Sequence, residues 1–164
     1  MPQSIHNFKI KIDYLSDRAE IITALAHWYH AQWGYLNPSR QIEDVIEKIK
    51  SHLGPEKIPT TFRAHYQNTL FGSAGLTQHD METHMQFSPW LAGVYVDWPY
   101  RRQGIGSALV HRVIEEVGSM GITRLYLFTP DQEPFYARLG WTRLEQAEVR
   151  NTSVIIMLFV LKPK

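Results

Sequence analysis

The sequence contains no cysteine, and this absence excludes two kinds of structure. Neither a disulfide bond nor a metal site with cysteine ligands can form. An imbalance of charge is missing too, because 17 lysine and arginine residues face 16 acidic residues. With positive and negative charges so nearly equal in number, the chain lacks the basic surface that nonspecific binding to nucleic acid requires. We therefore expect no nucleic-acid partner.

Long apolar runs are also absent, and no stretch approaches the ~20 residues of a transmembrane helix. The first residues, 1–6, lack the charged segment and apolar core of a secretory signal. No repeat, low-complexity segment or linker divides the 164 residues, of which 44% are hydrophobic. These observations predict one domain over residues 1–164, no membrane partner and a cytoplasmic location.

What the chain does contain is a regular succession of strand and helix patterns. Apolar residues at helical spacing predict a helix that Asp17 caps and Gly34 ends, and a second helix that starts at Asn37-Pro38 and stops before Gly54. The other expected elements are strands over 8–14, 61–66, 69–77, 90–96, 124–128, 141–145 and 153–161, helices over 104–117 and 133–139, and a polar loop over 78–89. This mixture predicts the α+β class.

The most informative segment is the turn between strand 90–96 and helix 104–117. Its sequence is Arg101-Arg102-Gln103-Gly104-Ile105-Gly106-Ser107. The two glycines leave the backbone open to a ligand, and the first N–H groups of the helix have no partner within it. The helix dipole adds a partial positive charge, and the two arginines add full charges. The segment therefore predicts a phosphate site at the start of a helix.

Two common phosphate-binding motifs do not fit this turn. No Lys-Ser or Lys-Thr pair follows the last glycine, which argues against a P-loop. A dinucleotide site needs three spaced glycines and an acidic residue after the next strand, but that strand ends in Thr129-Pro130. A turn whose glycines serve only the chain geometry is the simple alternative.

The pattern Arg101-x-x-Gly104-x-Gly106 resembles the pyrophosphate-binding signature of the GCN5-related N-acetyltransferases. The resemblance extends from Trp90 to Val110, and a second block, 125–141, is similar to the family's next strand, short helix and Phe-Tyr-x-x-x-Gly-aromatic ending. It implies a three-layer α+β fold with helices on both faces of a mixed, mostly antiparallel sheet. It also implies acetyl-CoA as co-substrate, an amine acceptor and no metal.

The resemblance places coenzyme A along the strand and the turn. In the family this strand separates from its neighbour at a bulge, and the pantetheine arm lies in the gap. A backbone N–H near Val94 would then stabilise the oxyanion that forms when an amine attacks the thioester. The coenzyme-binding residues implied in this way are Val94, Tyr95, Val96, Arg101, Arg102, Gln103, Gly104, Gly106, Ser107, Thr129 and Phe135.

The resemblance also suggests catalytic residues. Tyr136 is the candidate general acid, because the family's equivalent tyrosine can protonate the leaving thiolate, although an aromatic pair that only packs the short helix is the alternative. The strand before the signature lacks the glutamate that some members use as general base. The polar loop before it offers His79, Asp80 and Glu82, which the sequence does not distinguish from one another or from a solvated loop.

The acceptor is the least defined part of the prediction. Trp28, Trp33, Tyr35 and His84 are the candidate pocket residues, although the aromatics serve equally well as core. At pH 7 a lysine amine of pKa about 10.4 is roughly 0.04% neutral, whereas an α-amine near 7.8 is about 14% neutral. Without a strand carboxylate, a peptide N-terminus or small amino compound is favoured over lysine.

Several further alternatives stay open. Without cysteine there is no acetyl-cysteine route, so we expect direct attack by the amine in a ternary complex. A catalytically silent acyl-CoA-binding module and an acyltransferase with a longer donor are the competing functions. A homodimer is compatible with the sequence. His65, His79 and His84 show no spacing diagnostic of zinc.

Overall fold

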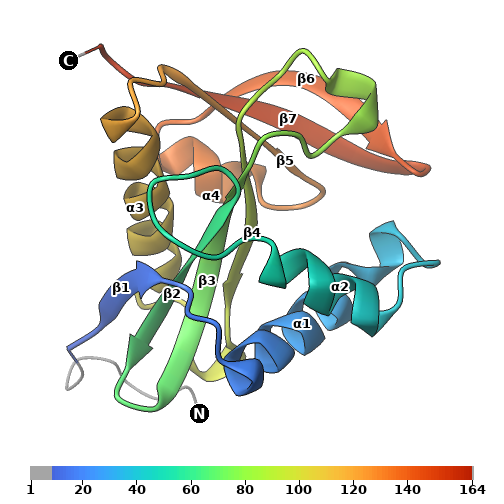
Figure 1. Cartoon of the computed structure of the whole chain (residues 1–164). Coiled ribbons are helices and arrows are strands. Elements are labelled where there is room, and N and C mark those ends of the chain that lie inside the picture. The colour runs from blue at the N-terminus through green and yellow to red at the C-terminus, as the bar shows by residue number, and fades with distance from the viewer. Residues whose placement is uncertain (1–8, 164) are drawn as a thin grey trace.

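The computed structural model describes residues 9–163 and shows a seven-stranded sheet with helices on both faces (Figure 1). The strands lie in the order β1-β2-β3-β4-β5-β7-β6, and only β4 and β5 are parallel neighbours. Their bounds are β1 Lys11–Tyr14, β2 Thr60–Tyr66, β3 Thr69–Thr77, β4 Trp90–Val96, β5 Arg124–Thr129, β6 Thr142–Val149 and β7 Thr152–Val160. The α+β class and the mixed, mostly antiparallel sheet are confirmed.

The helices form two groups, one on each face. The first group holds α1 (Ala19–Trp33) and α2 (Ile42–Lys50), and the second holds α3 (Ile105–Ser119) and α4 (Glu133–Arg138). Short 3₁₀ turns η1 (Gly34–Leu36), η2 (Glu82–His84) and η3 (Trp98–Tyr100) complete the chain. Within residues 9–163, none of the helices combines the length and the apolar composition needed to cross a bilayer.

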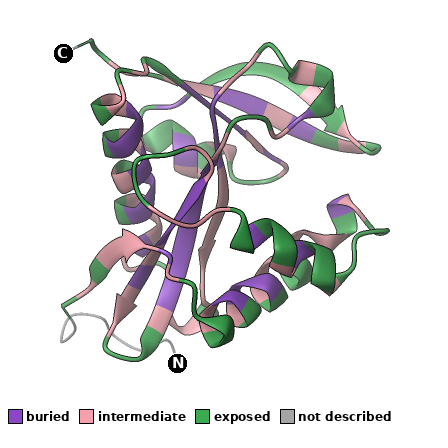
Figure 2. Ribbon diagram, in the orientation of Figure 1, coloured by how far each residue is buried: buried purple, intermediate pink, exposed green. Residues whose placement is uncertain are grey.

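The main core lies between α3 and the first half of the sheet. Leu109, Val113 and Val117 follow one another at about one helical turn and are fully buried against a cluster that includes Phe62 and Phe71 (Figure 2). Burying a side chain of this size stabilises the fold by about 1.5–3 kcal/mol. This packing holds the start of α3, and with it the glycine-rich turn, against the end of β4.

The predicted start of the first helix is wrong. The helix begins at Ala19, and the preceding Arg18 has an extended backbone with no side-chain capping bond. Asp17 therefore does not cap it. The side chain of Glu20, which would complete a capping box, instead pairs with Arg18 at 2.6 Å.

Other boundaries also differ from the prediction, among them the end of the second helix, which lies at Lys50 rather than next to Gly54. The second helix starts at Ile42 rather than at Asn37-Pro38, because Asp44 accepts a hydrogen bond of 2.9 Å from the backbone N–H of Gln41 and so caps the helix there. The strand expected over 141–145 continues to Val149, since its whole length pairs with β7. The strand expected over 8–14 is observed from residue 11, and residue 8 lies outside the described residues.

The strand that precedes the glycine-rich turn separates from its parallel neighbour. The register between β4 and β5 holds a single pair, Trp90 with Tyr126, near the start of β4. Beyond that pair the two strands diverge, and β4 continues along β3 alone (Figure 1). A gap in the middle of the sheet follows, as the family resemblance implies.

A bulge accompanies this gap. Ser73 of β3 pairs with Tyr95 and Gly75 pairs with Ala92, so Gly93 and Val94 together face one residue of β3. Gly93 has a φ of +61°, a left-handed conformation that glycine adopts without strain. The bulge implied by the resemblance is therefore present.

Candidate active site

A cleft of about 1260 Å³ opens where β4 and β5 separate. One side is formed by the starts of α3 and α4, and the other by α1, η1, α2 and the loop between β3 and β4. The predicted site residues that line it are Trp33, His79, Asp80, Glu82, Val94, Tyr95, Val96, Arg101, Arg102, Gly104, Gly106, Ser107, Thr129, Phe135 and Tyr136. Four others, Trp28, Tyr35, His84 and Gln103, do not line it.

The start of α3 forms one end of the cleft. Gly104 precedes the helix with a φ of +86°, and as a glycine it supplies no side-chain cap to the first turn. No atom lies within 4 Å of the position that a Cβ on Gly104 would occupy, so the backbone is open there. The N–H groups of the first turn are therefore exposed to an anion in the cleft.

Gly106 serves a different purpose from Gly104. A Cβ at this position would lie 3.4 Å from Cζ of Phe135 and 3.7 Å from Cγ2 of Val96. The missing side chain lets the first turn of α3 approach both the end of β4 and the aromatic ring of α4. Three of the elements that border the cleft, β4, α3 and α4, thus meet at Gly106.

The two arginines of the turn have different surroundings. Arg101 donates a hydrogen bond from Nε to the carbonyl oxygen of Val96 at 2.7 Å, and its guanidinium lies 4.5 Å from the ring centre of Trp98. These contacts attach the turn to the end of β4. Arg102 is exposed and has a φ of +63°, which is unfavourable for a residue with a side chain. Arg102 thus presents its charge to solvent at the mouth of the cleft.

A chain of buried hydroxyl groups supports the bulge of β4. The hydroxyl of Ser73 donates to the carbonyl oxygen of Gly93 at 2.9 Å and accepts a hydrogen bond from the hydroxyl of Tyr29. Since a serine has one proton to donate, the tyrosine must be the donor of the second bond. Burial raises the pKa of Tyr29 to about 12, so it keeps this proton.

This chain has a consequence for the next peptide group. The carbonyl of Gly93 points toward β3, and in a trans peptide the N–H of the following residue points the opposite way. Successive N–H groups of a strand point to alternate sides. The N–H of Asp97 bonds to the carbonyl of Phe71 on β3 at 2.8 Å, so the N–H of Val94, three residues earlier, also points away from β3. The backbone N–H of Val94 is therefore directed into the gap beside β5.

The loop candidates for a general base differ in their surroundings. Asp80 lies on the cleft wall, where burial raises its pKa to about 6 even though Lys48 and Arg40 favour its charged form. His79 and Glu82 also line the cleft but are exposed. The environment of Asp80 moves its pKa toward neutral pH, as a general base needs.

Tyr136 both lines the cleft and packs in the core. Its ring lies edge-on to Phe135 at 5.0 Å and to Trp141 at 6.0 Å. Burial, together with the nearby charge of Asp131, raises the pKa of its hydroxyl well above the usual value. The hydroxyl is therefore protonated at neutral pH and can act as a hydrogen-bond donor.

The predicted acceptor residues are only partly brought together. Trp28 stacks on Tyr95 at 5.1 Å, and Trp33 meets the same ring edge-on at 6.1 Å. Tyr35 is 56% exposed, beyond the cleft lining. His84 bonds through Nε2 to Oε1 of Glu145 on β6 at 2.5 Å, which holds it away from the cleft.

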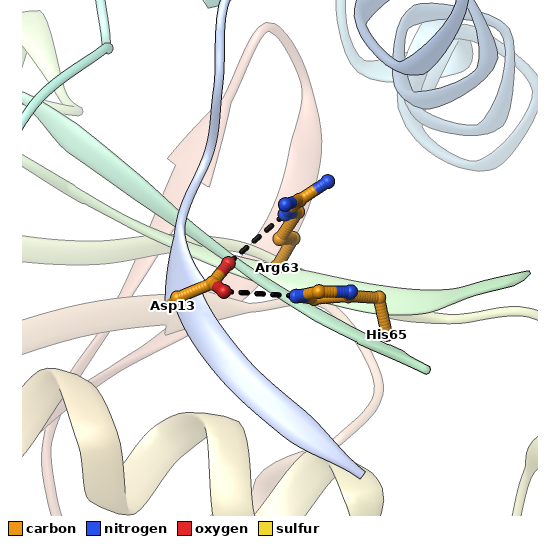
Figure 3. Close-up of polar contacts among 3 residues, drawn as sticks. All are labelled: Asp13, Arg63 and His65. Atoms are coloured by element: carbon orange, nitrogen blue, oxygen red, sulfur yellow. Dashed lines mark hydrogen bonds and ion pairs between the residues drawn. The ribbon is translucent and has the colours of Figure 1, made fainter. Parts of the chain in front are cut away.

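The histidines considered for zinc do not converge. His65 bonds to Asp13, which also pairs with Arg63, each at 2.9 Å, in a separate cluster on β1 and β2 (Figure 3). His79 lies in the cleft, and His84 faces β6. Among residues 9–163, no group of three histidine, aspartate or glutamate side chains is arranged to hold a metal ion.

Four residues of this site escaped the sequence analysis. Ser73 is a polar residue in an otherwise apolar buried strand, which is the one local signal that could have drawn attention to it. Tyr29 belongs to an apolar helical stripe and looks like core. Arg40 and Lys48 are exposed cations whose proximity to Asp80 depends on the tertiary fold.

Comparisons with known proteins agree with this architecture. The sequence model described as "Acetyltransferase (GNAT) family" matches residues 22–141. No curated protein sequence matches. An aminoglycoside 6'-N-acetyltransferase complexed with coenzyme A is similar in fold, with a TM-score of 0.74 and 19% identity, over 94% of this chain and 98% of the other.

Two further structures are also similar in fold, with slightly lower TM-scores. An aminoglycoside 6'-acetyltransferase type Ii has a TM-score of 0.71 and 21% identity, over 94% of this chain and 99% of its own. The protein yncA from Salmonella typhimurium, solved with its cofactor acetyl-CoA, has a TM-score of 0.71 and 15% identity, over 93% and 94%. Because the family model covers most of the sequence, this chain belongs to the acetyltransferase (GNAT) family.

Proposed function

We propose that this protein transfers an acetyl group from acetyl-CoA to a primary amine of low pKa, by direct attack in a ternary complex. One observation carries the proposal: the open first turn of α3, the N–H of Val94 and the carboxylate of Asp80 all border the same cleft. An anion site, an oxyanion donor and a base are the three parts that this reaction requires.

Several features of the cleft itself support the binding of coenzyme A. The uncapped amides of the first turn of α3, with Arg102 beside them, would hold the pyrophosphate. The edge of β4 that faces the gap offers backbone groups to the amides of the pantetheine arm, through Val94 and Val96. Coenzyme A supplies the activated thioester carbonyl, and the residues of the chain orient it.

Each catalytic residue then has a defined task. Asp80, with a pKa of about 6, is roughly nine-tenths ionised at pH 7 and accepts a proton from the attacking amine. The N–H of Val94 donates to the carbonyl oxygen as it becomes negative. The new N–C bond forms and the C–S bond breaks, so the electron pair leaves on sulfur.

The role of Tyr136 is narrower than that of a full acid. Because its pKa is raised, its hydroxyl is a weaker acid than a thiol, whose pKa is about 8.5. It stabilises the departing sulfur by donating a hydrogen bond, and water supplies the proton that completes the thiol. The predicted acid role of Tyr136 thus becomes hydrogen-bond donation to the leaving group.

Release of thiol on addition of an amine tests this function. The chain has no cysteine, so every thiol that a disulfide reagent detects comes from coenzyme A. We expect release with acetyl-CoA to depend on the amine and to be faster for α-amines than for lysine side chains. Release that depends on lysine side chains alone would contradict the low-pKa acceptor, and thermal stabilisation by acetyl-CoA without release would indicate a binding module.

A further inference from the structure

Charged side chains are distributed unevenly in the acceptor half of the cleft. Both signs occur along its walls, but the charges that act on Asp80 are all positive. They belong to Lys48 on α2 and to Arg40, which precedes α2. The other acidic residues of the same cleft, Glu82, Asp131 and Glu148, do not contribute to the pKa shift at Asp80. The surroundings of the proposed base are therefore cationic.

Neither cation is occupied by a protein partner. Within residues 9–163, Arg40 and Lys48 form no ion pair, although both lie close enough to Asp80 to favour its charged form. The neighbouring Lys50 behaves differently, because it pairs with Glu47 at 3.5 Å. The N–H donors of Arg40 and Lys48 therefore remain available in the cleft.

The backbone around these cations is well positioned. The ring nitrogen Nε2 of His30 on α1 lies 3.3 Å from the carbonyl oxygen of Arg40, which ties the segment before α2 to α1. Lys48 lies one turn after Val45, which is buried in an apolar cluster between α1 and α2 that includes Ile22 and Leu25. The helix α2 and the segment before it thus hold Lys48 and Arg40 in defined positions opposite the β3–β4 loop.

A further sign of positive potential comes from His52. This partly buried residue also lines the cleft, and burial together with Lys48 and Lys57 lowers its pKa to about 4. It is therefore neutral at pH 7. The C-terminal end of α2 therefore favours a negatively charged ligand.

We propose that the acceptor is an amine that carries a carboxylate close to the amino group, with Arg40 and Lys48 binding the carboxylate while the amine faces Asp80. This inference rests on the proposed acetyl transfer. Guanidinium and ammonium groups bind carboxylates through charge-assisted hydrogen bonds, and the spacing between opposite charges fixes the orientation of a small zwitterion. Amino acids and short peptides with an acidic group near the N-terminus have this chemistry.

The same arrangement helps to deprotonate the acceptor. In a free amino acid the carboxylate stabilises the ammonium ion and raises the pKa of the amine. When Arg40 and Lys48 neutralise the carboxylate, this stabilisation is lost, and their own charges disfavour the ammonium form further. The cations therefore make the amine a better nucleophile beside a carboxylate base of moderate strength.

Polycationic acceptors fit the cleft poorly. The positive charges of Lys48 and Arg40 beside Asp80 would repel a second ammonium group at the place where the acceptor amine must lie. The solved structures similar in fold include aminoglycoside 6'-acetyltransferases, but at 19% and 21% identity this likeness concerns the fold. The charges of this chain favour an acceptor of the opposite sign.

The test compares matched acceptors and matched variants. An amino acid and its carboxamide are assayed with acetyl-CoA, together with a diamine, an aminoglycoside and an aminoalkyl phosphate. The carboxamide has the more readily deprotonated amine, so a preference for the acid cannot arise from intrinsic reactivity. Lys48→Met and Arg40→Gln remove the cations, and Lys50→Met is the control on the same helix, outside the cleft lining.

We expect the wild type to prefer the amino acid. Lys48→Met and Arg40→Gln should each lower its kcat/KM by about 10- to 100-fold, the loss of one charged hydrogen bond, and change that of the carboxamide much less. The ratio of the two substrates is the readout, because any effect of Lys48 on the basicity of Asp80 applies to both. Lys50→Met should leave both values unchanged.

The outcomes separate this inference from the proposed function. Acetylation of the diamine, the aminoglycoside, the carboxamide or the phosphate in preference to the amino acid would overturn the carboxylate site and leave N-acetyl transfer standing. An equal loss in Lys50→Met, or an unchanged substrate ratio in Lys48→Met and Arg40→Gln, would also overturn it. If no amine is acetylated, both proposals fail.

Discussion

Replacing Ser73 with alanine tests whether the hydroxyl chain under β4 aligns the oxyanion donor. The Ser73 side chain is fully buried and bonds to both Tyr29 and Gly93. Ser73→Ala leaves the tyrosine hydroxyl and the glycine carbonyl without this partner. Each lost bond costs about 1 kcal/mol, and a buried group without a partner costs about 1–3 kcal/mol, so we expect the free energy of unfolding to fall by about 2–4 kcal/mol.

The catalytic effect should exceed what lower stability explains. An oxyanion-hole donor is worth about 10²- to 10³-fold in rate, and Ser73→Ala keeps the N–H of Val94 but frees its orientation. We therefore expect kcat to fall by about 10- to 100-fold, with a KM for acetyl-CoA that changes by less than about 3-fold. Steady-state kinetics well below the unfolding temperature measure both.

Two further variants separate alignment from stability. Tyr29→Phe removes the outer hydrogen bond and leaves the bond from Ser73 to Gly93, so it should cost about 1 kcal/mol and less than about 5-fold in kcat. Ser119→Ala removes a bond of 2.7 Å to the carbonyl of Glu116, far from the cleft, and should leave kcat unchanged. If Ser73→Ala loses stability but keeps kcat within about 2-fold of the wild type, the chain is structural only and the reasoning is refuted.

Other substitutions test the remaining parts of the site. When kcat/KM is calculated per neutral amine, its pH profile should rise and level off above about pH 6, and Asp80→Asn should lose this rise together with about 10²- to 10⁴-fold in rate. Burial raises the folded-state pKa of Asp80 to about 6, above the 3.8 of an ordinary aspartate, so the folded protein loses stability as the pH rises from about 4 through 6. Chemical denaturation at pH 7.5 should therefore show Asp80→Asn to be more stable than the wild type, by up to about 3 kcal/mol, or by less because the side chain keeps some solvent contact. Tyr136→Phe should lower kcat by about 10-fold, and normal turnover with reduced stability would show that the ring only packs. Arg102→Gly should weaken coenzyme A binding, measured by calorimetry, by about 10-fold, and by less at high salt. Its free energy of unfolding should stay equal or rise, because glycine adopts a φ of +63° without strain. An unchanged affinity would place the charge of Arg102 outside the site.

Local patterns explain why so much of the fold was predictable. The apolar stripe of α3 and the glycines at 104 and 106 are each visible within a few consecutive residues; the stripe is buried and the backbone at Gly104 is open as predicted, whereas Gly106 instead permits close packing against Phe135 and Val96. The capping error at Asp17 has a similarly local cause. An acidic residue before a helix often caps it, but here Glu20 pairs with Arg18 instead of completing a capping box with Asp17. Nothing in the sequence shows which of these two interactions of Glu20 is preferred.

The finer parts of the site depend on contacts between distant residues. Ser73 meets Tyr29 across 44 positions and Gly93 across 20, so no short window contains the chain that directs Val94. The same holds for Asp80, whose pKa reflects burial and two cations that precede it by more than 30 residues. Sequence patterns could place a base in the loop before β4, but the burial of Asp80 and its proximity to Lys48 and Arg40 exist only in the folded chain.

Transfer of a labelled acetyl group tests the central claim most directly. The protein is incubated with acetyl-CoA that carries a labelled acetyl group, with and without an amino-acid acceptor, and the products are analysed by mass spectrometry and thiol release. We predict that the label appears on the amine nitrogen with one thiol released per label, and that the protein alone acquires none. Label that remains on the protein, or thiol released without an acetylated amine, would contradict direct transfer in a ternary complex.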